Sequence, residues 1–143
     1  MPKCIVIADD LTGANAKGVL LKKMNYSAYT VLNAERLELS MLEQCDCVLY
    51  PTDSRGIDQD LAYRRVSNVC NLLKNEDTKV YGKRIDSTLR GNLGAEVDAM
   101  LESLGEDYVA IVVACFPTSS RIVLGGYMLV EGLPLHKTDI AID

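Results

Sequence analysis

Carboxylates and cationic side chains gather in a few short segments of this chain, and these are the residues that could do chemistry. They are Asp9, Asp10, Asp53, Asp86, Arg55, Lys83, Arg84, Arg90 and Arg121. An arginine fork binds a carboxylate through two parallel hydrogen bonds, whereas an aspartate accepts hydrogen bonds from hydroxyl groups. One aspartate could also remove the proton from a reacting hydroxyl. This balance predicts a site for a small polyhydroxy acid.

The longest of these polar segments is the loop 83–92, with the sequence Lys-Arg-Ile-Asp-Ser-Thr-Leu-Arg-Gly-Asn. It precedes a helical pattern that ends at Gly105, so it lies at a helix N-terminus, where unpaired N–H groups and the helix dipole favour an anion. Ser87 supplies a hydroxyl, and Gly91 lets the backbone approach a ligand. The alternative is a solvated turn between a strand and a helix, with ordinary capping residues.

Strand and helix patterns alternate along the chain. Apolar, β-branched runs predict strands at 4–8, 27–32, 47–50, 79–82 and 108–114, the last being the clearest buried strand. Helical periodicity falls at 14–24, 34–42, about 58–74 and 93–104. Residues 122–143 show no helix, only turns around a short strand pair. This order predicts an α/β fold with a doubly wound, mostly parallel, Rossmann-like sheet.

In such a sheet the loops that leave the carboxyl ends of the strands line the ligand crevice. Four polar loops follow predicted strands, at 9–13, 52–56, 83–92 and 117–121. We therefore expect their side chains to converge on one edge of the sheet.

Composition excludes several other classes of protein. The 143 residues fit one domain, 48% of them are hydrophobic, and no apolar run is long enough to span a bilayer. The net charge of −5 argues against nucleic-acid binding. The N-terminus lacks a signal-peptide pattern, so we expect a cytoplasmic protein without membrane association.

The five cysteines are scattered and odd in number, which predicts reduced, mostly buried thiols. Cys45 and Cys47 could be two ligands of a metal ion, but no second pair or neighbouring histidine completes a site. No metal site is predicted.

Nucleotide-binding motifs are missing from the sequence. Residues 13–18 have the glycine spacing of a P-loop, yet Val19 and Leu20 occupy the positions of the required Lys and Ser or Thr. No Gly-x-Gly-x-x-Gly fingerprint follows a strand. No cofactor-binding residue is therefore assigned.

Four segments together resemble a known family. They are Ile-Ala-Asp-Asp-Leu-Thr-Gly-Ala-Asn at 7–15, Thr-Asp-Ser-Arg at 52–55, the loop 83–92, and the stretch from Phe-Pro at 116–117 to Gly-Leu-Pro-Leu at 132–135. In that order they resemble the N-terminal domain of the four-carbon acid sugar kinases, across nearly the whole chain. The third segment is the most specific.

The resemblance implies an ATP-dependent kinase that acts on threonate, erythronate or 3-oxo-tetronate-like acids. In that family the N-terminal domain holds the acid, and a separate C-terminal domain binds ATP, usually with Mg²⁺. The residues that would bind the acid are Asp9, Asp10, Arg55, Lys83, Asp86, Ser87 and Arg90. The catalytic base stays unassigned. Residues 1–143 would form a partial, truncated N-terminal domain without the nucleotide domain, and neither ATP nor Mg²⁺ is expected to bind this chain alone.

Two other functions fit the same residues. A response-regulator receiver also carries two acids after its first strand and a phosphorylated aspartate after its third, here Asp53; against it, Cys115, Phe116 and Pro117 follow the fifth predicted strand, where a receiver has a lysine. A non-catalytic acid-binding module would have the same fold and the same binding residues, and it would differ only in transferring no phosphate.

The oligomeric state is a further expectation. Exposed apolar surface could drive self-association, so a homodimer is expected as one possibility.

Overall fold

A four-stranded parallel sheet forms the centre of the protein. In the computed structural model, which describes residues 1–33 and 37–142, the strands β1 (Cys4–Ala8), β2 (Ala28–Thr30), β3 (Cys47–Pro51) and β4 (Val80–Arg84) lie in the order β2-β3-β1-β4. All three neighbouring pairs are parallel. The predicted doubly wound α/β fold is confirmed.

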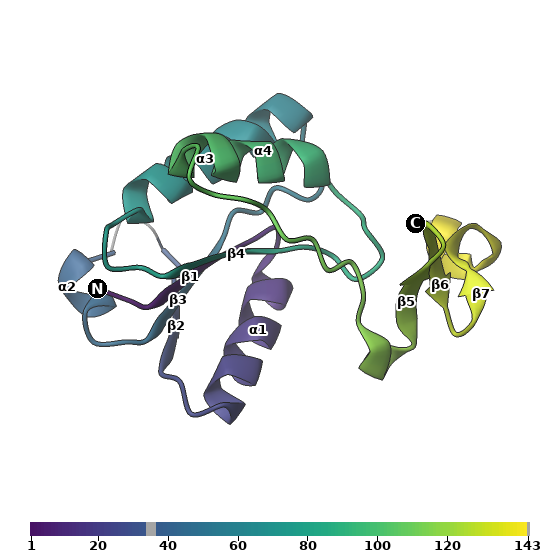
Figure 1. Cartoon of the computed structure of the whole chain (residues 1–143), viewed down its shortest axis with the longest axis horizontal. Helices are drawn as coiled ribbons and strands as arrows, with labels where there is room; N and C mark the ends of the chain where they lie inside the picture. The colour runs from purple at the N-terminus through teal and green to yellow at the C-terminus, as the bar shows by residue number, and fades with distance from the viewer. Residues whose placement is uncertain (34–36, 143) are drawn as a thin grey trace.

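Helices cover both faces of this sheet (Figure 1). Helix α1 (Leu11–Lys23) lies on one face, and α3 (Gln59–Leu73) and α4 (Leu93–Leu104) lie side by side on the other. The short helix α2 (Leu39–Leu42) precedes β3. The predicted helix at 34–42 is therefore shorter than expected, and its residues 34–36 lie outside the described part of the chain.

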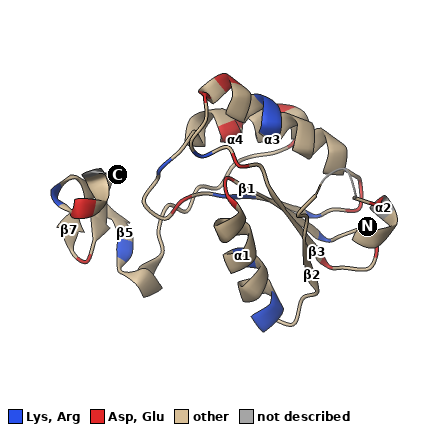
Figure 2. Ribbon diagram, turned by 180° about the vertical axis from the view of Figure 1, so that it is seen from behind, with Lys and Arg blue, Asp and Glu red and all other residues tan. Residues whose placement is uncertain are grey.

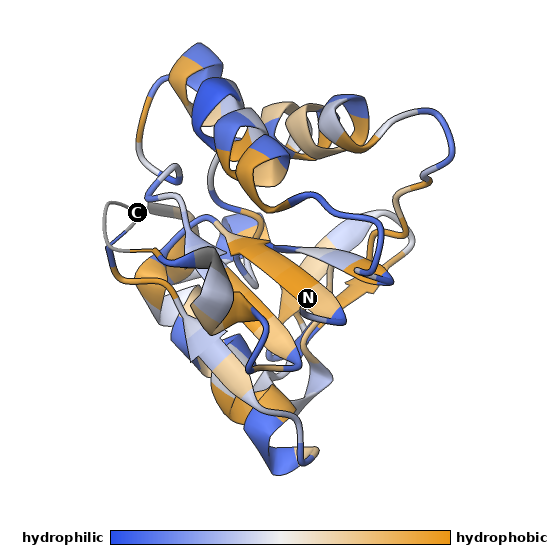
Figure 3. Ribbon diagram, turned by 90° about the vertical axis from the view of Figure 1, so that its left-hand side faces the viewer, coloured by the Kyte–Doolittle hydropathy of each residue, from blue (hydrophilic) through white to orange (hydrophobic). Residues whose placement is uncertain are grey.

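Alternation along the strands sends side chains into two cores. Ile5 and Ile7 of β1 pack under α3 and α4, whereas Val6 and Ala8 pack with Ala14 on the α1 side. All these side chains are almost fully buried. In Figure 3 the strands are correspondingly hydrophobic between helices whose outer faces are hydrophilic. Burial on both faces explains why the strand sequences are continuous apolar runs.

Capping residues fix where the helices begin and end. The Asp10 carboxylate accepts a hydrogen bond from Gly13 N at 2.7 Å and starts α1. The Asp58 carboxylate accepts from the backbone N–H groups of residues 60 and 61 and starts α3. Gly105, with φ of 108°, ends α4 as the sequence predicted.

The predicted strand at 108–114 is wrong. The segment is extended but belongs to no strand, and Val109 and Ile111 are 83% and 86% exposed. It starts beside β4, where the rings of Tyr81 and Tyr108 meet edge to face at 5.8 Å, and it lines a cavity of about 650 Å³ together with α4 and β4. Strand β4 therefore remains the edge of the sheet.

The chain ends in a small antiparallel sheet. Strands β5 (Arg121–Leu124), β6 (Tyr127–Val130) and β7 (Leu133–Pro134) lie in that order, with 3-10 turns before and after them. The sheet is set apart from the four-stranded sheet (Figure 1). The expected short strand pair is thus confirmed, with a third short strand added.

No helix in the described residues combines the length and the apolar character needed to cross a membrane.

Two neighbouring leucines of α3 allow a matched test of the core. Leu73 is 1% exposed within the α3/α4 core, whereas Leu72 is 51% exposed. We expect Leu73→Ala to lower the free energy of unfolding by about 2–5 kcal/mol, because it leaves a cavity. Leu72→Ala should change it by less than about 1 kcal/mol. Urea denaturation followed by circular dichroism measures both, and equal losses would contradict this packing.

Candidate acid-binding site

Three loops meet at one edge of the sheet because the strands that carry them end at the same level. Ala8, the last residue of β1, pairs with Pro51 of β3 and with Arg84 of β4. The loops that follow therefore start side by side. Figure 2 shows acidic and basic positions together where these loops leave the sheet, above the N-terminus of α1.

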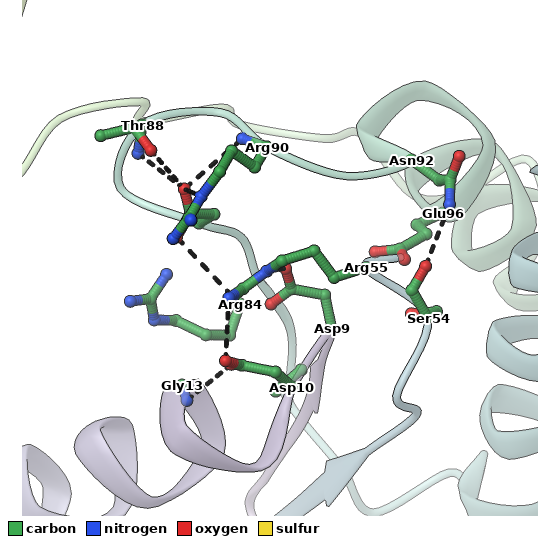
Figure 4. Close-up of polar contacts among 12 residues, drawn as sticks. Asp9, Asp10, Gly13, Ser54, Arg55, Arg84, Thr88, Arg90, Asn92 and Glu96 are labelled. Carbon is green, nitrogen blue, oxygen red and sulfur yellow. Dashed lines mark hydrogen bonds and ion pairs between the residues drawn. The ribbon is translucent and has the colours of Figure 1, made fainter. Parts of the chain in front are cut away.

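The guanidinium of Arg55 joins these loops. Its Nε donates to Asp9 Oδ2 at 2.7 Å, its Nη1 lies 2.9 Å from Asp10 Oδ2, and its Nη2 lies 3.7 Å from Asp86 Oδ1 (Figure 4). The hydrogen bond to Asp9 is the main reason that the pKa of Arg55 is raised. A residue after β3 thus contacts carboxylates that follow β1 and β4, as the sequence predicted for converging loops.

Asp86 is held by its own loop as well. Burial would raise the pKa of this carboxyl, but hydrogen bonds from Arg90 and Thr88 outweigh burial and lower it well below its ordinary value. Thr88 Oγ1 donates to Asp86 Oδ2 at 2.6 Å, and Arg90 Nε donates to the same oxygen at 3.0 Å. Asp86 is therefore a fixed anion whose oxygens are occupied by donors.

Within the cluster that Arg55 joins, Asp9 has a carboxylate oxygen with spare capacity to accept a hydrogen bond. Its side chain is 2% exposed, and while Oδ2 receives Arg55, Oδ1 is buried without a hydrogen-bond partner in the described part of the chain. The loop after β3 is fixed to Asp9, because Ser54 N donates to its carbonyl oxygen at 3.0 Å. A buried carboxylate oxygen without a donor is costly, so this oxygen is suited to a ligand hydroxyl.

Lys83 and Arg84 are neighbours in β4 and point to opposite faces of the sheet. The Nζ of Lys83 lies 2.6 Å from Glu96 Oε2 under α4, and both side chains are almost fully buried. Arg84 is on the α1 side, where a Cβ built on Gly13 would lie 3.3 Å from Arg84 Cγ. Lys83, a predicted site residue, is therefore used to hold α4 to the sheet.

Of the other predicted residues, only some lie near the cluster that Arg55 joins. Ser87 is half-buried and lines a cavity of about 340 Å³ beside α1, together with Asp86. Asp53 is exposed and has a φ of 49°, and no hydrogen bond or ion pair joins its side chain to the cluster within the described residues. Arg121 lies in β5 of the small sheet. The loop 117–121 thus does not converge with the other three as predicted.

The charged cluster also lies at a different helix N-terminus from the one that the sequence predicts. The N-terminus of α4 was the predicted anion site, but Asn92 uses its side-chain Nδ2 to donate to the carbonyl oxygens of Ser54 and Ile57, each at 2.9 Å. The acid–base cluster lies at the start of α1, where Asp10 is both cap and ion-pair partner. The buried Glu96 was missed, because an acid inside an amphipathic helix normally faces water.

The thiols are not part of this cluster. Cys4 pairs with Cys47 in the strand register, and burial raises the pKa of the Cys4 thiol to about 11. All five cysteines are free; Cys47 and Cys70 are buried, Cys4 and Cys45 half-buried, and Cys115 exposed. The thiols of Cys4, Cys45, Cys47 and Cys70 have raised pKa values and so are poor nucleophiles at neutral pH.

The donor set does not fit a metal ion. Among residues 1–33 and 37–142 no three His, Cys, Asp or Glu side chains are grouped so that they could hold one. Arg55 lies between the carboxylates of Asp9, Asp10 and Asp86 and occupies the position that a cation would need.

Known proteins match this chain across its length. Residues 4–143 match the family model of the sugar-binding N-terminal domain. D-erythronate kinase of Heliobacterium modesticaldum is 49% identical over 143 residues, which is 100% of this chain and 33% of that protein. D-threonate kinase of Salmonella typhimurium is 36% identical, and the match covers 99% of this chain and 33% of that protein. 3-Oxo-tetronate kinase of Haemophilus influenzae is 31% identical, and the match covers 93% of this chain and 32% of that protein. The chain spans about a third of the length of the curated relatives it matches.

A solved structure agrees with the fold. The crystal structure of a domain of unknown function from Bordetella bronchiseptica, a domain-swapped dimer with bound citrate, has a TM-score of 0.91 and 29% identity, and the match covers 99% of this chain and 36% of that chain. The family resemblance drawn from the motifs is confirmed.

Gly91 and Gly94 provide a matched test of the loop that carries Arg90. Gly91 has a φ of 98°, and a Cβ there would lie 3.2 Å from Arg55 Cγ, whereas a Cβ on Gly94 meets nothing within 4 Å. We expect Gly91→Ala to lower the free energy of unfolding by about 1–3 kcal/mol. Gly94→Ala should leave it unchanged or raise it by up to about 1 kcal/mol. Urea denaturation measures the free energy of unfolding of both variants. A Gly91→Ala variant as stable as wild type would contradict the described contact with Arg55.

The lowered pKa of Asp86 makes stability depend on pH. The ionised carboxylate contributes fully at pH 7, above its unfolded pKa of about 3.9, and the contribution is lost as the pH falls below that value towards the folded pKa. We therefore expect the difference in unfolding free energy between wild type and Asp86→Asn to shrink between pH 7 and pH 3. Asp107→Asn, at an exposed position, is the control. A constant difference across this range would contradict the arrangement.

Proposed function

Because this chain belongs to the family of sugar-binding N-terminal domains, we propose that it is the acid-sugar-binding part of an ATP-dependent kinase that phosphorylates a four-carbon sugar acid. The names of its relatives support erythronate, threonate or 3-oxo-tetronate as the substrate class. The bound citrate in the Bordetella protein supports a hydroxy acid as ligand.

The observation that carries the proposal is the Arg55 bridge between the loops after β1, β3 and β4. It holds Asp9 and Asp86 at fixed positions, as a small ligand with several hydroxyl groups requires. Asp9 Oδ1 would accept a hydrogen bond from a substrate hydroxyl. Asp10, Arg55, Arg90 and Ser87 would complete the acid-binding set, while Lys83 would support it through Glu96.

The nucleotide would be bound elsewhere. The chain spans about a third of the length of its kinase relatives, and the site carboxylates Asp10 and Asp86 are engaged by arginines. We therefore propose that ATP and Mg²⁺ bind a C-terminal domain, which brings the phosphoryl donor to a hydroxyl held by residues 1–143.

A homodimer is part of this proposal. The Bordetella relative is a domain-swapped dimer. In this chain Val109, Ile111, Val112 and Val113 are each at least 66% exposed. Such a run of apolar surface favours burial against a second copy.

Calorimetry tests the acid-binding role. The 143-residue chain should bind erythronate or threonate without ATP and should bind the neutral polyol erythritol far more weakly, because only the acids offer a carboxylate to arginine. Arg90→Ala should weaken acid binding by about 10-fold or more, since hydrogen bonds to charged groups contribute about 1.5–3 kcal/mol. Lys23→Ala, at the exposed end of α1, is the control. Equal affinities for wild type and Arg90→Ala would count against the site.

A chimera tests the kinase itself. Residues 1–143 replace the N-terminal third of the Heliobacterium kinase, to which they are 49% identical. The chimera should transfer phosphate from ATP to erythronate, as monitored by ADP release, and Asp9→Asn in the chimera should reduce the rate. A chimera that binds the acid but never phosphorylates it would favour a non-catalytic acid-binding module.

A further inference from the structure

Arg84 is a partly buried cation at the site, and no anion in the described part of the chain pairs with it. Its guanidinium makes no hydrogen bond and no ion pair within the described residues, and in Figure 4 no dashed line reaches it. Three other cations of the polar loops are engaged: Arg55 and Arg90 contact carboxylates of the cluster, and Lys83 contacts Glu96. A guanidinium partly removed from water without a counter-ion is costly, so it is suited to an anionic ligand.

The side chain of Arg84 is held in place by its surroundings. It extends from the last position of β4 on the α1 side, and the first turn of α1 packs against its aliphatic part, because a Cβ on Gly13 would lie 3.3 Å from Arg84 Cγ. The missing side chain at residue 13 thus makes room for Arg84. The positive end of the 13-residue helix α1 adds to the local potential.

Arg84 also lines a cavity that is large enough for a small ligand. The residues that line the cavity of about 340 Å³ beside α1 include Lys17, Arg84, Asp86, Ser87 and residues 113–116. This volume lies at the lower end of the range for small-molecule sites. The one carboxylate in the lining, Asp86, is already covered by Thr88, Arg90 and Arg55, so it does not neutralise Arg84.

We propose that Arg84 anchors the carboxylate of the acid sugar in this cavity, with Lys17 and Ser87 at its border. Guanidinium groups have donors only and a planar fork that matches a carboxylate, so Arg84 selects the acid end of the ligand. The hydroxyl-bearing end then extends towards the cluster around Asp9. This inference rests on the proposed function and adds Arg84 to the acid-binding set that the family resemblance implies, which does not contain it.

Calorimetry on the 143-residue chain tests it with two ligands, erythronate and erythritol. Arg84→Gln should weaken erythronate binding by about 10- to 100-fold and leave the weak affinity for erythritol unchanged, so that the preference for the acid is lost. Arg84→Lys should restore part of the affinity, because the charge returns without the fork. Arg64→Gln, at an exposed position of α3, is the matched control and should bind as wild type does.

The outcomes separate this inference from the proposed function. If wild type binds neither erythronate nor threonate, the proposed function itself fails. If wild type binds the acid and Arg84→Gln binds it equally well, only the role of Arg84 is overturned. A loss of affinity for both ligands to the same extent would also overturn it, because it would mean that Arg84 supports the fold and does not select the carboxylate. Circular dichroism and urea denaturation of Arg84→Gln show whether the variant is folded.

Discussion

The contact of one arginine with three carboxylates is the constraint on which this site depends. Arg55 follows β3, whereas Asp9 and Asp10 follow β1 and Asp86 follows β4. The guanidinium therefore reaches residues that lie 46, 45 and 31 positions away from it in the sequence, and it can do so only because a parallel sheet brings the strand ends together. The carboxylates in turn offset the cost of removing Arg55 from water. Sheet order, loop conformation and site geometry are therefore coupled through a single side chain.

Much of the four-stranded unit could be predicted from the sequence, because parallel strands that are buried on both faces leave apolar runs such as Cys4–Ala8, and helices leave capping residues such as Asp58. The segment 108–114 shows the limit of that reasoning. Its residues have the composition of a buried strand, but composition does not say whether a partner strand lies within hydrogen-bonding distance. Pairing is a non-local property, and here the residues are exposed.

For the site, too, the sequence predicts local features but not how residues from different elements come together. The loops and most of their charged residues could be found from the sequence, since they directly follow apolar runs. The direction of each side chain could not, except where a strand imposes alternation: Lys83 and Arg84 are adjacent, so only one of them could face the α1 side. That rule favours neither residue until the faces of the sheet are known. Glu96, 1% exposed beneath α4, identifies the face that Lys83 occupies.

The separation between the two sheets has a consequence for cooperativity. Strands β5, β6 and β7 form their own ladder, and residues 109–114 connect it to the rest as an extended, largely exposed segment (Figure 1). Loss of order in the small ladder removes few buried contacts from the larger unit, so the chain is expected to melt in two stages and to exchange its C-terminal amide protons with solvent well before those of β1.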